Sequence, residues 1–342
     1  MTIAQPLIGD DVQFVSAAPT KHPLRSTIQH WQLRDLVCCP TSRHEVLYVH
    51  GNNVSVYNAS TKVSTPILKD LAFPPTCISA GLGYLVVGGQ RSQLLVRSLT
   101  SSWFTQHSVG ACINNALVLT QNPNGPAGST RLLACNNDES IKVFDLPSMQ
   151  RVANLTLPTA VNYAAVSPDG VNLAAVGDSN QVFLYSAAGS ASYARTSTIT
   201  VPGSSAGFSC SWNPTGDKFA IASQDGLVLV YDHRAPTTPM ATFMSTVPAS
   251  DRGAVRCVKW SPSSAMDLLA FTEHVSHVHF VDARNFNERQ VVRVCPRGSE
   301  AHITGMSFSP DSRTVFVGTE AALLEFEVNS RARRSFPAGG VL

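Results

Sequence analysis

The sequence predicts an all-β fold in which seven four-stranded antiparallel sheets are arranged radially, as the blades of a β-propeller. Three observations predict this fold. A proline turn recurs at nearly constant spacing, short strands with alternating apolar residues surround each turn, and 342 residues are enough for seven such units.

The recurring turn is clearest in the second half of the chain. Pro168, Pro214, Pro262 and Pro310 are 46, 48 and 48 residues apart, and each follows a Ser or Asn. Proline fixes φ in a tight turn, and the neighbouring Ser, Asn, Asp and Gly residues suit the remaining turn positions. A strand is predicted before each turn and two after it, the latter at Asn172–Val176 and Gln181–Tyr185, Lys218–Ser223 and Leu227–Tyr231, Asp267–Thr272 and His277–Val281, and Thr314–Gly318 and Ala322–Phe326.

The first half of the chain follows the same plan less regularly. Between Pro40 and Pro168 there is room for three units of about 43 residues each. The predicted strands are Leu36–Cys39, Glu45–Val49 and Val54–Tyr57; Cys77–Ser79, Tyr84–Val87 and Gln93–Val96; and Ile113–Leu119, Arg131–Ala134 and Ile141–Phe144. The polar insertion Thr120–Thr130 is predicted to be an exposed loop.

The two ends of the repeat region predict how the ring closes. The last unit has no clear fourth strand after Glu327, whereas Thr27–Gln32 has strand character and no unit of its own. We therefore expect Thr27–Gln32 to be the outer strand of the last blade, which would join the two ends and remove an open edge. This divides the chain into a tail at 1–25, the propeller at 26–329 and a second tail at 330–342.

Composition limits the possible partners and compartments. Hydrophobic residues make up 44% and charged residues 14% of the chain, and the net charge of +2 does not favour a nucleic-acid partner. The eight cysteines form no CxxC pair, which favours free thiols in a reducing compartment. The first residues do not resemble a signal peptide, and no apolar run has the length of a membrane span. We therefore expect a cytoplasmic or nuclear location, or both, without a membrane partner.

Aromatic-acidic pairs end some of the third strands. Phe144-Asp145 and Tyr231-Asp232 resemble the Trp-Asp ending of WD40 repeats, and the resemblance covers about residues 27 to 328. The segment Asp267–Phe286 further resembles the DUF2415 segment of fungal WD-repeat proteins. That group includes a WD-repeat substrate receptor of the fungal GID ubiquitin ligase. The resemblance thus implies a binding platform without a cofactor, whose partners are proteins or peptides in a multi-protein complex.

The propeller topology places two sets of loops on one face, around the mouth of the channel. These are the loops before each first strand and the loops between the second and third strands. Residues in such loops mix both charges with an aromatic ring, as a peptide-binding surface does, while loop solvation is the alternative for each one. The candidate partner-binding residues are Asn52, Arg91, Asp138, Asn162, Asp178, Phe208, Asp225, Arg256, Glu273, His274 and Thr304.

Two other patterns have a functional and a structural interpretation. Asp232-x-Arg234 and Asp282-x-Arg284 resemble the box by which some propellers dock, through the bottom rim, on the adaptor of cullin-4 ubiquitin ligases. We favour the alternative that each Asp caps a turn. His274 and His277 have a spacing that could hold a metal only in a loop, because residues three apart in a strand point to opposite faces. We favour histidine packing in the fold.

No motif of a known catalytic centre is present. The sequence lacks an HExxH motif, a P-loop, a GxGxxG loop and the strand-to-helix turn of a nucleophile elbow, so we assign no catalytic, cofactor-binding or metal-binding residue. The predicted function is a non-enzymatic scaffold or adaptor for a protein or peptide, specifically a substrate receptor of a ubiquitin ligase. The alternative is a propeller enzyme, a metal-dependent lactonase or hydrolase that uses the central channel. In the tail, Arg331, Arg333 and Arg334 are expected to be solvated, and Phe336–Leu342 is a candidate docking segment.

Overall fold

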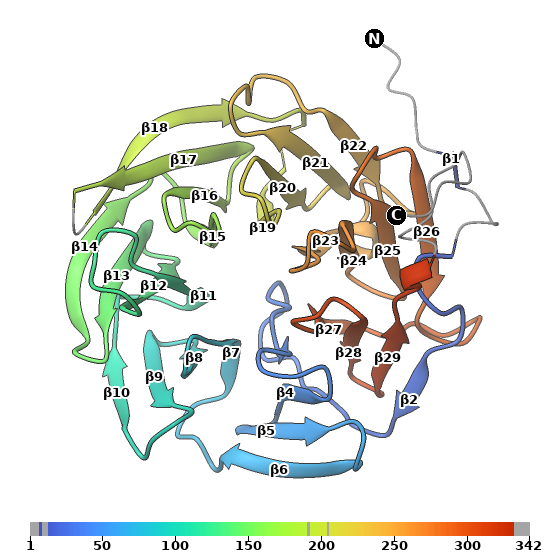
Figure 1. The fold of residues 1–342 in the computed structure, drawn as a ribbon, viewed down its shortest axis with the longest axis horizontal. Coiled ribbons are helices and arrows are strands. Elements are labelled where there is room, and N and C mark those ends of the chain that lie inside the picture. Colours follow the sequence, from blue (N-terminus) through green and yellow to red (C-terminus); the bar gives the residue numbers. More distant parts are fainter. Residues whose placement is uncertain (1–6, 9–12, 190–191, 204, 332–342) are drawn as a thin grey trace.

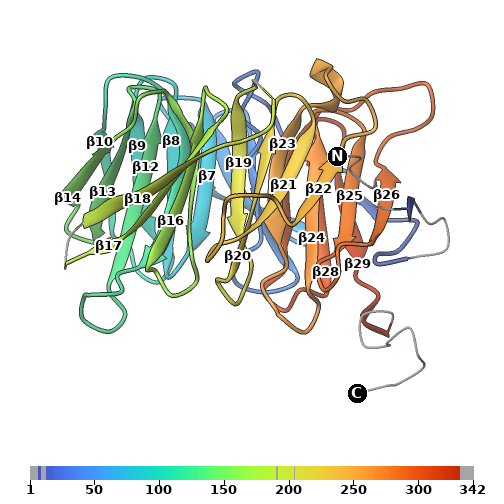
Figure 2. The same cartoon turned by 90° about the horizontal axis from the view of Figure 1, so that it is seen from above.

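A computed structural model describes residues 7–8, 13–189, 192–203 and 205–331. These residues form seven sheets around a central axis, each with the first strand of its blade nearest the axis and the fourth strand towards the rim (Figure 1). Seen edge-on, the strands run between the two faces of a disc, and loops project from both faces (Figure 2). The predicted seven-bladed antiparallel propeller is confirmed.

Blades 1 to 4 occupy the first part of the chain. Their strands are β3 Val37–Cys38, β4 Glu45–His50, β5 Asn53–Asn58 and β6 Val63–Leu68; β7 Pro75–Gly81, β8 Tyr84–Gly89, β9 Gln93–Ser98 and β10 Phe104–Ser108; β11 Asn114–Gln121, β12 Thr130–Asn136, β13 Ser140–Leu146 and β14 Gln150–Thr156; and β15 Val161–Val166, β16 Asn172–Gly177, β17 Gln181–Ala188 and β18 Ser192–Thr200. The insertion predicted at Thr120–Thr130 is shorter than expected, because β11 continues to Gln121 and β12 begins at Thr130.

Blades 5 to 7 complete the ring. Their strands are β19 Gly207–Trp212, β20 Lys218–Ser223, β21 Leu227–Asp232 and β22 Ala241–Met244; β23 Val255–Trp260, β24 Leu268–Glu273, β25 His277–Asp282 and β26 Glu288–Arg293; and β27 Ile303–Phe308, β28 Thr314–Thr319, β29 Leu323–Glu327 and β2 Thr20–His22. The short strand β1, Leu7–Ile8, pairs in parallel with β26, and the 3₁₀ turn η1, Asp251–Gly253, precedes β23.

Apolar side chains of neighbouring blades pack against one another to form the core. Trp212 of blade 5 shows the pattern, because it packs among the residues of blades 4 and 5 and its indole N–H donates to the Ala165 carbonyl at 3.0 Å. Trp260 repeats this contact one blade later, donating to the Ser211 carbonyl at 3.1 Å. The bulky residue that ends an inner strand therefore fixes its blade against the preceding one.

The strand that closes the ring lies earlier than predicted. β2 pairs antiparallel with β29, so the prediction that Thr27–Gln32 closes the last blade is wrong. Two of the three β2 residues are exposed, so this strand has no apolar alternation that a sequence pattern could reveal. His22 fixes it on both sides, because Nε2 lies 2.8 Å from the Glu325 carboxylate of blade 7 and Nδ1 lies 3.0 Å from the Tyr57 hydroxyl of blade 1.

Part of the predicted N-terminal tail also belongs to the propeller. Phe14 and Val15 are fully buried against blades 6 and 7, and Val15 forms a bridge with Val328. The Gln290 side chain accepts hydrogen bonds from the backbone N–H groups of Phe14 and Val15 at 2.8 and 2.9 Å. The boundary predicted at residue 26 is therefore too late. Residues 1–6 and 9–12 of that tail lie outside the described residues.

No helix in the described ranges has the length and apolar character that a membrane crossing requires.

Phe14→Ala should test how much the N-terminal segment contributes to closure. Phe14 is 1% exposed, so its truncation should lower the free energy of unfolding by about 3 kcal/mol and the Tm by several degrees. Thermal unfolding of the purified chain measures the change. Phe104→Ala is the control, because this side chain on outer strand β10 is 62% exposed and should leave Tm unchanged. Equal Tm values for the two variants would contradict a role of Phe14 in closure.

Candidate functional site

A ring of bulged residues surrounds the mouth of the channel. The inner strands of blades 2 to 7 each have a register shift near their start, where one residue has no partner on the second strand. We call the face that carries these residues the top face; it also carries the loops between the second and third strands. The bulged residues are Thr76, Asn115, Asn162, Phe208, Arg256 and Thr304, and all are buried.

In blades 2 to 4 the bulged side chain ties its blade to the next one. Thr76 donates its hydroxyl to the Asn114 carbonyl at 3.0 Å. Asn115 and Asn162 donate their amide groups to the carbonyls of Val161 and Gly207, at 2.8 and 2.9 Å. In each case the acceptor is the first residue of the next inner strand. We call these contacts the interblade clamps. Asn162, predicted as a partner-binding residue, therefore stabilises the fold.

The clamps stop at blade 5. Phe208 has no polar group to donate, and Arg256 of blade 6 stacks over it, with its guanidinium carbon 4.0 Å from the ring centroid. Thr304 of blade 7 is fully buried, and the structure gives its hydroxyl no hydrogen-bond partner among the described residues. The top face is thus built differently over blades 5 to 7 from blades 2 to 4.

A cavity of about 360 Å³ opens where the clamps stop. We call it the mouth cavity. It joins the N-terminal segment to the top loops of blades 6 and 7. It is lined by Ile28, Trp31, Arg34, Asp251, Arg256, His274, His302 and Glu320. Of the predicted partner-binding residues, the structure brings together Arg256 and His274 here, with Phe208 beneath Arg256.

The N-terminal segment reaches the mouth cavity because it crosses the end of the channel between β2 and β3. Asp35 anchors it there, with a carboxylate oxygen 2.8 Å from the Lys259 Nζ and the other accepting the Tyr163 hydroxyl at 3.1 Å. Burial alone would lower the pKa of Lys259, but the adjacent Asp35 carboxylate holds it well above its usual range. Through these two contacts, Asp35 ties blades 4 and 6 to the segment that carries Trp31 and Arg34.

Two buried guanidiniums form the floor of the mouth cavity. Arg34 and Arg256 are each 5% exposed. Both approach the same acceptor, the Nδ1 atom of His274, at 3.5 and 3.4 Å. The Nε of Arg34 and one terminal nitrogen of Arg256 have no hydrogen-bond partner among the described residues. Burial lowers the pKa of Arg34 to about 10 and that of Arg256 to about 9, so both remain charged at neutral pH.

His274 is neutral in this environment. Burial, followed by the charges of Arg34 and Arg256, lowers its pKa to about 3. A neutral ring can accept at Nδ1 from both guanidiniums, which a protonated ring could not. His302 packs against it edge-on, with 5.0 Å between ring centroids. His274 therefore holds two cations side by side without supplying a negative charge.

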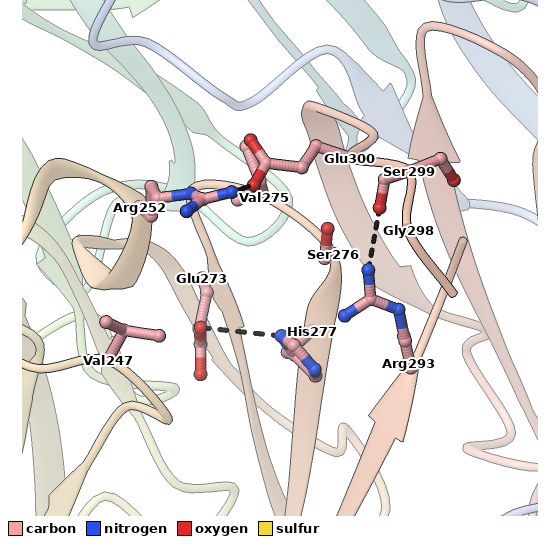
Figure 3. A pocket seen from close by; sticks show the side chains of 10 residues that line it. All are labelled: Val247, Arg252, Glu273, Val275, Ser276, His277, Arg293, Gly298, Ser299 and Glu300. Atoms are coloured by element: carbon pink, nitrogen blue, oxygen red, sulfur yellow. Dashed lines mark hydrogen bonds and ion pairs between the residues drawn. The ribbon is translucent and has the colours of Figure 1, made fainter. Parts of the chain in front are cut away.

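A second hollow of about 300 Å³ is lined by Glu273, Val275 and His277, among other residues (Figure 3). An ion pair between Arg252 and Glu300 spans it, and Arg293 donates to the Ser299 carbonyl at 2.6 Å. We call it the outer cavity. His277 lines it, whereas His274 lines the mouth cavity, so the two histidines lie in different cavities. Among the described residues, no group of three or more His, Cys, Asp or Glu side chains is arranged to hold a metal ion.

Glu273 lies at the base of the outer cavity and is occupied by the fold. Its carboxylate accepts the Thr246 N–H and hydroxyl at 2.6 and 2.9 Å and lies 2.7 Å from Nε2 of the buried His279. Burial alone would raise the pKa of Glu273, but the hydrogen bonds of His279 and Thr246 hold it below its usual range. Glu273 thus joins blades 5 and 6.

The other predicted top-face residues lie in the expected loops but do not line the mouth cavity. Asn52 donates to the Leu71 carbonyl at 3.0 Å, and Asp138 pairs with Lys142 at 2.7 Å. Asp178 accepts from Asn162 at 2.8 Å, Asp225 accepts from the Ser223 hydroxyl, and Arg91 is exposed. Sequence reasoning missed Trp31 and Arg34, because it placed the first in a strand and assigned no role to the second. A tryptophan outside every repeat unit was the available signal.

The two Asp-x-Arg pairs end the third strands of blades 5 and 6, on the opposite face. Each guanidinium folds back onto the Asp two residues earlier, with Arg234 2.9 Å from Asp232 and Arg284 2.7 Å from Asp282. Arg234 is 77% exposed and Arg284 29%. Arg333, Arg334 and the candidate docking segment Phe336–Leu342 lie outside the described residues.

Comparisons with known proteins agree with this architecture. The model of the WD domain, G-beta repeat, matches residues 195–232, which run from the outer strand of blade 4 to the third strand of blade 5. An uncharacterised protein domain, DUF2415, matches residues 253–293, which make up blade 6 and include Arg256 and His274. The chain is a WD40-repeat β-propeller protein that carries the DUF2415 segment.

Two relatives are fungal proteins described as uncharacterized. The chain is 29% identical to one from Schizosaccharomyces pombe over 349 residues, which cover 99% of both chains. It is 30% identical to one from Saccharomyces cerevisiae over 221 residues, covering 54% of this chain and 30% of the other. A propeller in a crystal structure of the mitotic checkpoint complex superposes with a TM-score of 0.72 at 16% identity, with 96% of each chain covered, which shows the shared fold.

His274→Asn should reduce the loss of stability in acid. The folded chain holds the pKa of His274 near 3 instead of 6.5, so protonation favours the unfolded chain. The neutral ring therefore costs the folded chain no stability above about pH 6.5, and the free energy of unfolding decreases as the pH falls from there towards 3. Asparagine offers an oxygen acceptor but does not titrate, so the fall of Tm between about pH 7 and pH 5 should become smaller. Thermal unfolding in a pH series measures it.

The slope should not vanish in the His274→Asn variant, because burial also lowers the pKa of His279, to about 4. His107→Asn, on the exposed outer strand β10, is the matched control and should keep the parent slope. An unchanged slope in the His274 variant would show that folding does not lower the pKa of this ring.

Proposed function

We propose that this chain is a non-enzymatic receptor that binds a peptide segment of a partner protein at the mouth cavity and brings it to a multi-protein complex, a ubiquitin ligase. The mouth cavity carries this proposal. It combines Trp31, a 63% exposed aromatic ring, with two buried guanidiniums that have unused donors. Aromatic and arginine side chains around a partly desolvated hollow are typical of the centres of peptide-binding surfaces.

The interblade clamps support this choice of surface. In blades 2 to 4 the bulged side chains are occupied by the fold, whereas in blades 5 and 6 the equivalent positions hold Phe208 and Arg256. In blades 5 and 6 the bulged residues are thus not used for interblade clamps. A rigid ring that leaves a few such positions for other contacts is typical of a scaffold that carries a binding site on its loops. The WD40 propeller fold supports an interaction scaffold in general.

The charged group in the channel favours binding over metal-dependent hydrolysis. A hydrolase of that kind needs several oxygen ligands that converge on the axis. Asp35, which contacts the inner strands of blades 4 and 6, is instead paired with the ammonium group of Lys259, which would repel a metal cation.

The ubiquitin-ligase part of the proposal rests on the resemblance of Asp267–Phe286 to the DUF2415 segment of fungal WD-repeat proteins, which implies a receptor of that kind. We propose a cytoplasmic or nuclear location, or both. All eight cysteines are free, as expected for a reducing compartment.

Surface variants of the tagged full-length chain should separate the partner from the complex. Trp31→Ala on the top face should lose the partner protein in affinity purification with mass spectrometry while ligase subunits remain. Arg234→Ala on the opposite rim should keep the partner and lose ligase subunits if that rim docks. Phe104→Ala matches Trp31 in exposure, at 62% against 63%, and should change neither.

Each outcome of this purification bears on one part of the proposal. Partners recovered without any ligase subunit would remove the ubiquitin-ligase part and leave an adaptor. A partner list that Trp31→Ala leaves unchanged would contradict the mouth cavity as the binding site.

A further inference from the structure

We propose that Arg34 and Arg256 together bind one carboxylate group, carried by an acidic residue of the bound peptide, at the floor of the mouth cavity. This inference rests on the proposed function, because it names the chemistry that the peptide must offer to that cavity. Three observations carry it: unused donors, fixed geometry and the distribution of charge around the floor.

The first observation is that the floor has more donors than acceptors. The Nε of Arg34 and a terminal nitrogen of Arg256 are buried without a partner among the described residues. The contacts that both guanidiniums do make with His274, at 3.5 and 3.4 Å, are long and are directed at a single acceptor atom. Buried donors without acceptors are rare in folded proteins and call for an explanation. A carboxylate has two oxygens and can accept from both guanidiniums at once.

The second observation is that both guanidiniums are held in place before any ligand arrives. Arg34 donates to the carbonyls of His30 and Leu33 at 2.9 and 2.8 Å. Arg256 is stacked on Phe208 and lies 5.8 Å from the Trp31 ring centroid. Groups fixed in this way lose little conformational freedom on binding. The fold therefore holds two like charges side by side, and an anion between them would reduce their repulsion.

The third observation is the sign of the surrounding charges. Asp251 and Glu320 also line the mouth cavity, but both are exposed, at its rim. Glu320 acts on Arg34 and Asp251 on Arg256 through their charges, each raising the pKa of the guanidinium, but neither carboxylate is in an ion pair with them within the described residues. The floor is thus positive and the rim negative. A singly charged carboxylate is repelled less by such a rim than a phosphoryl group, which carries nearly two charges. Trp31 and Ile28 offer apolar contacts for the rest of the peptide.

A peptide library displayed against the intact chain tests the preference directly. The selected peptides should share one Asp or Glu position. For a selected peptide, replacing that residue by Asn or Gln should weaken binding, measured by fluorescence polarisation, about tenfold or more. Arg256→Gln and Arg34→Gln should each bring this acid-to-amide ratio close to one. Glu320→Gln is the matched control at the rim, and it should keep the ratio or increase it.

Further variants keep the test decisive. Arg256→Lys retains the charge but not the planar fork, so the ratio should fall between those of the parent and Arg256→Gln. This variant also serves if Arg256→Gln does not fold, which thermal unfolding shows. The same peptide with phosphoserine at the acidic position should bind no better than the carboxylate form.

The outcomes separate this inference from the function on which it rests. Peptides that bind through Trp31 without an acid preference, or with one that Arg34→Gln and Arg256→Gln leave intact, would overturn the carboxylate site and leave the receptor. An Arg-dependent preference for phosphoserine would also overturn the carboxylate assignment. The absence of any selected peptide, together with an unchanged partner list for Trp31→Ala, would overturn the receptor itself.

Discussion

The ring depends on a contact between the two ends of the propeller, where β2 pairs with β29 and His22 links Glu325 of blade 7 to Tyr57 of blade 1. A propeller without this contact would expose the edge of its last blade and lose the packing between its first and last sheets. The chain that leaves β2 then crosses the mouth of the channel and supplies Trp31, Arg34 and Asp35. Closure of the ring and formation of the mouth cavity therefore depend on one N-terminal segment.

Bulged inner strands give the propeller a repeated position with two uses. In blades 2 to 4 the bulged residue is a short polar side chain that reaches the first carbonyl of the next blade. Each clamp holds the start of the next inner strand in place. In blades 5 and 6 the same position holds Phe208 and Arg256, which cannot make this contact and stack on each other instead.

The buried cations near the channel mouth also fall into two groups, one paired within the fold and one not. Lys259 lies in the channel paired with Asp35, so its charge is neutralised within the fold and ties distant blades together. Arg34 and Arg256 are also buried, and the hydrogen-bond acceptor that they share is the neutral His274. Burial of a cation whose nearest carboxylates are solvent-exposed destabilises the folded chain, and a bound anion would offset that cost.

The sequence by itself determined the number of blades, most strand positions and the loops of the top face, because turn chemistry and apolar alternation are local properties that recur with the repeat. Four residues predicted in the loops before the inner strands, Asn162, Phe208, Arg256 and Thr304, lie at the bulges near the start of those strands. Only the tertiary structure decided which strand closes the ring and which side chains share a cavity. β2 is three residues long and mostly exposed, and Arg34 meets His274 across 240 residues of sequence. Such contacts follow from ring geometry, and they have no local pattern that a sequence could show.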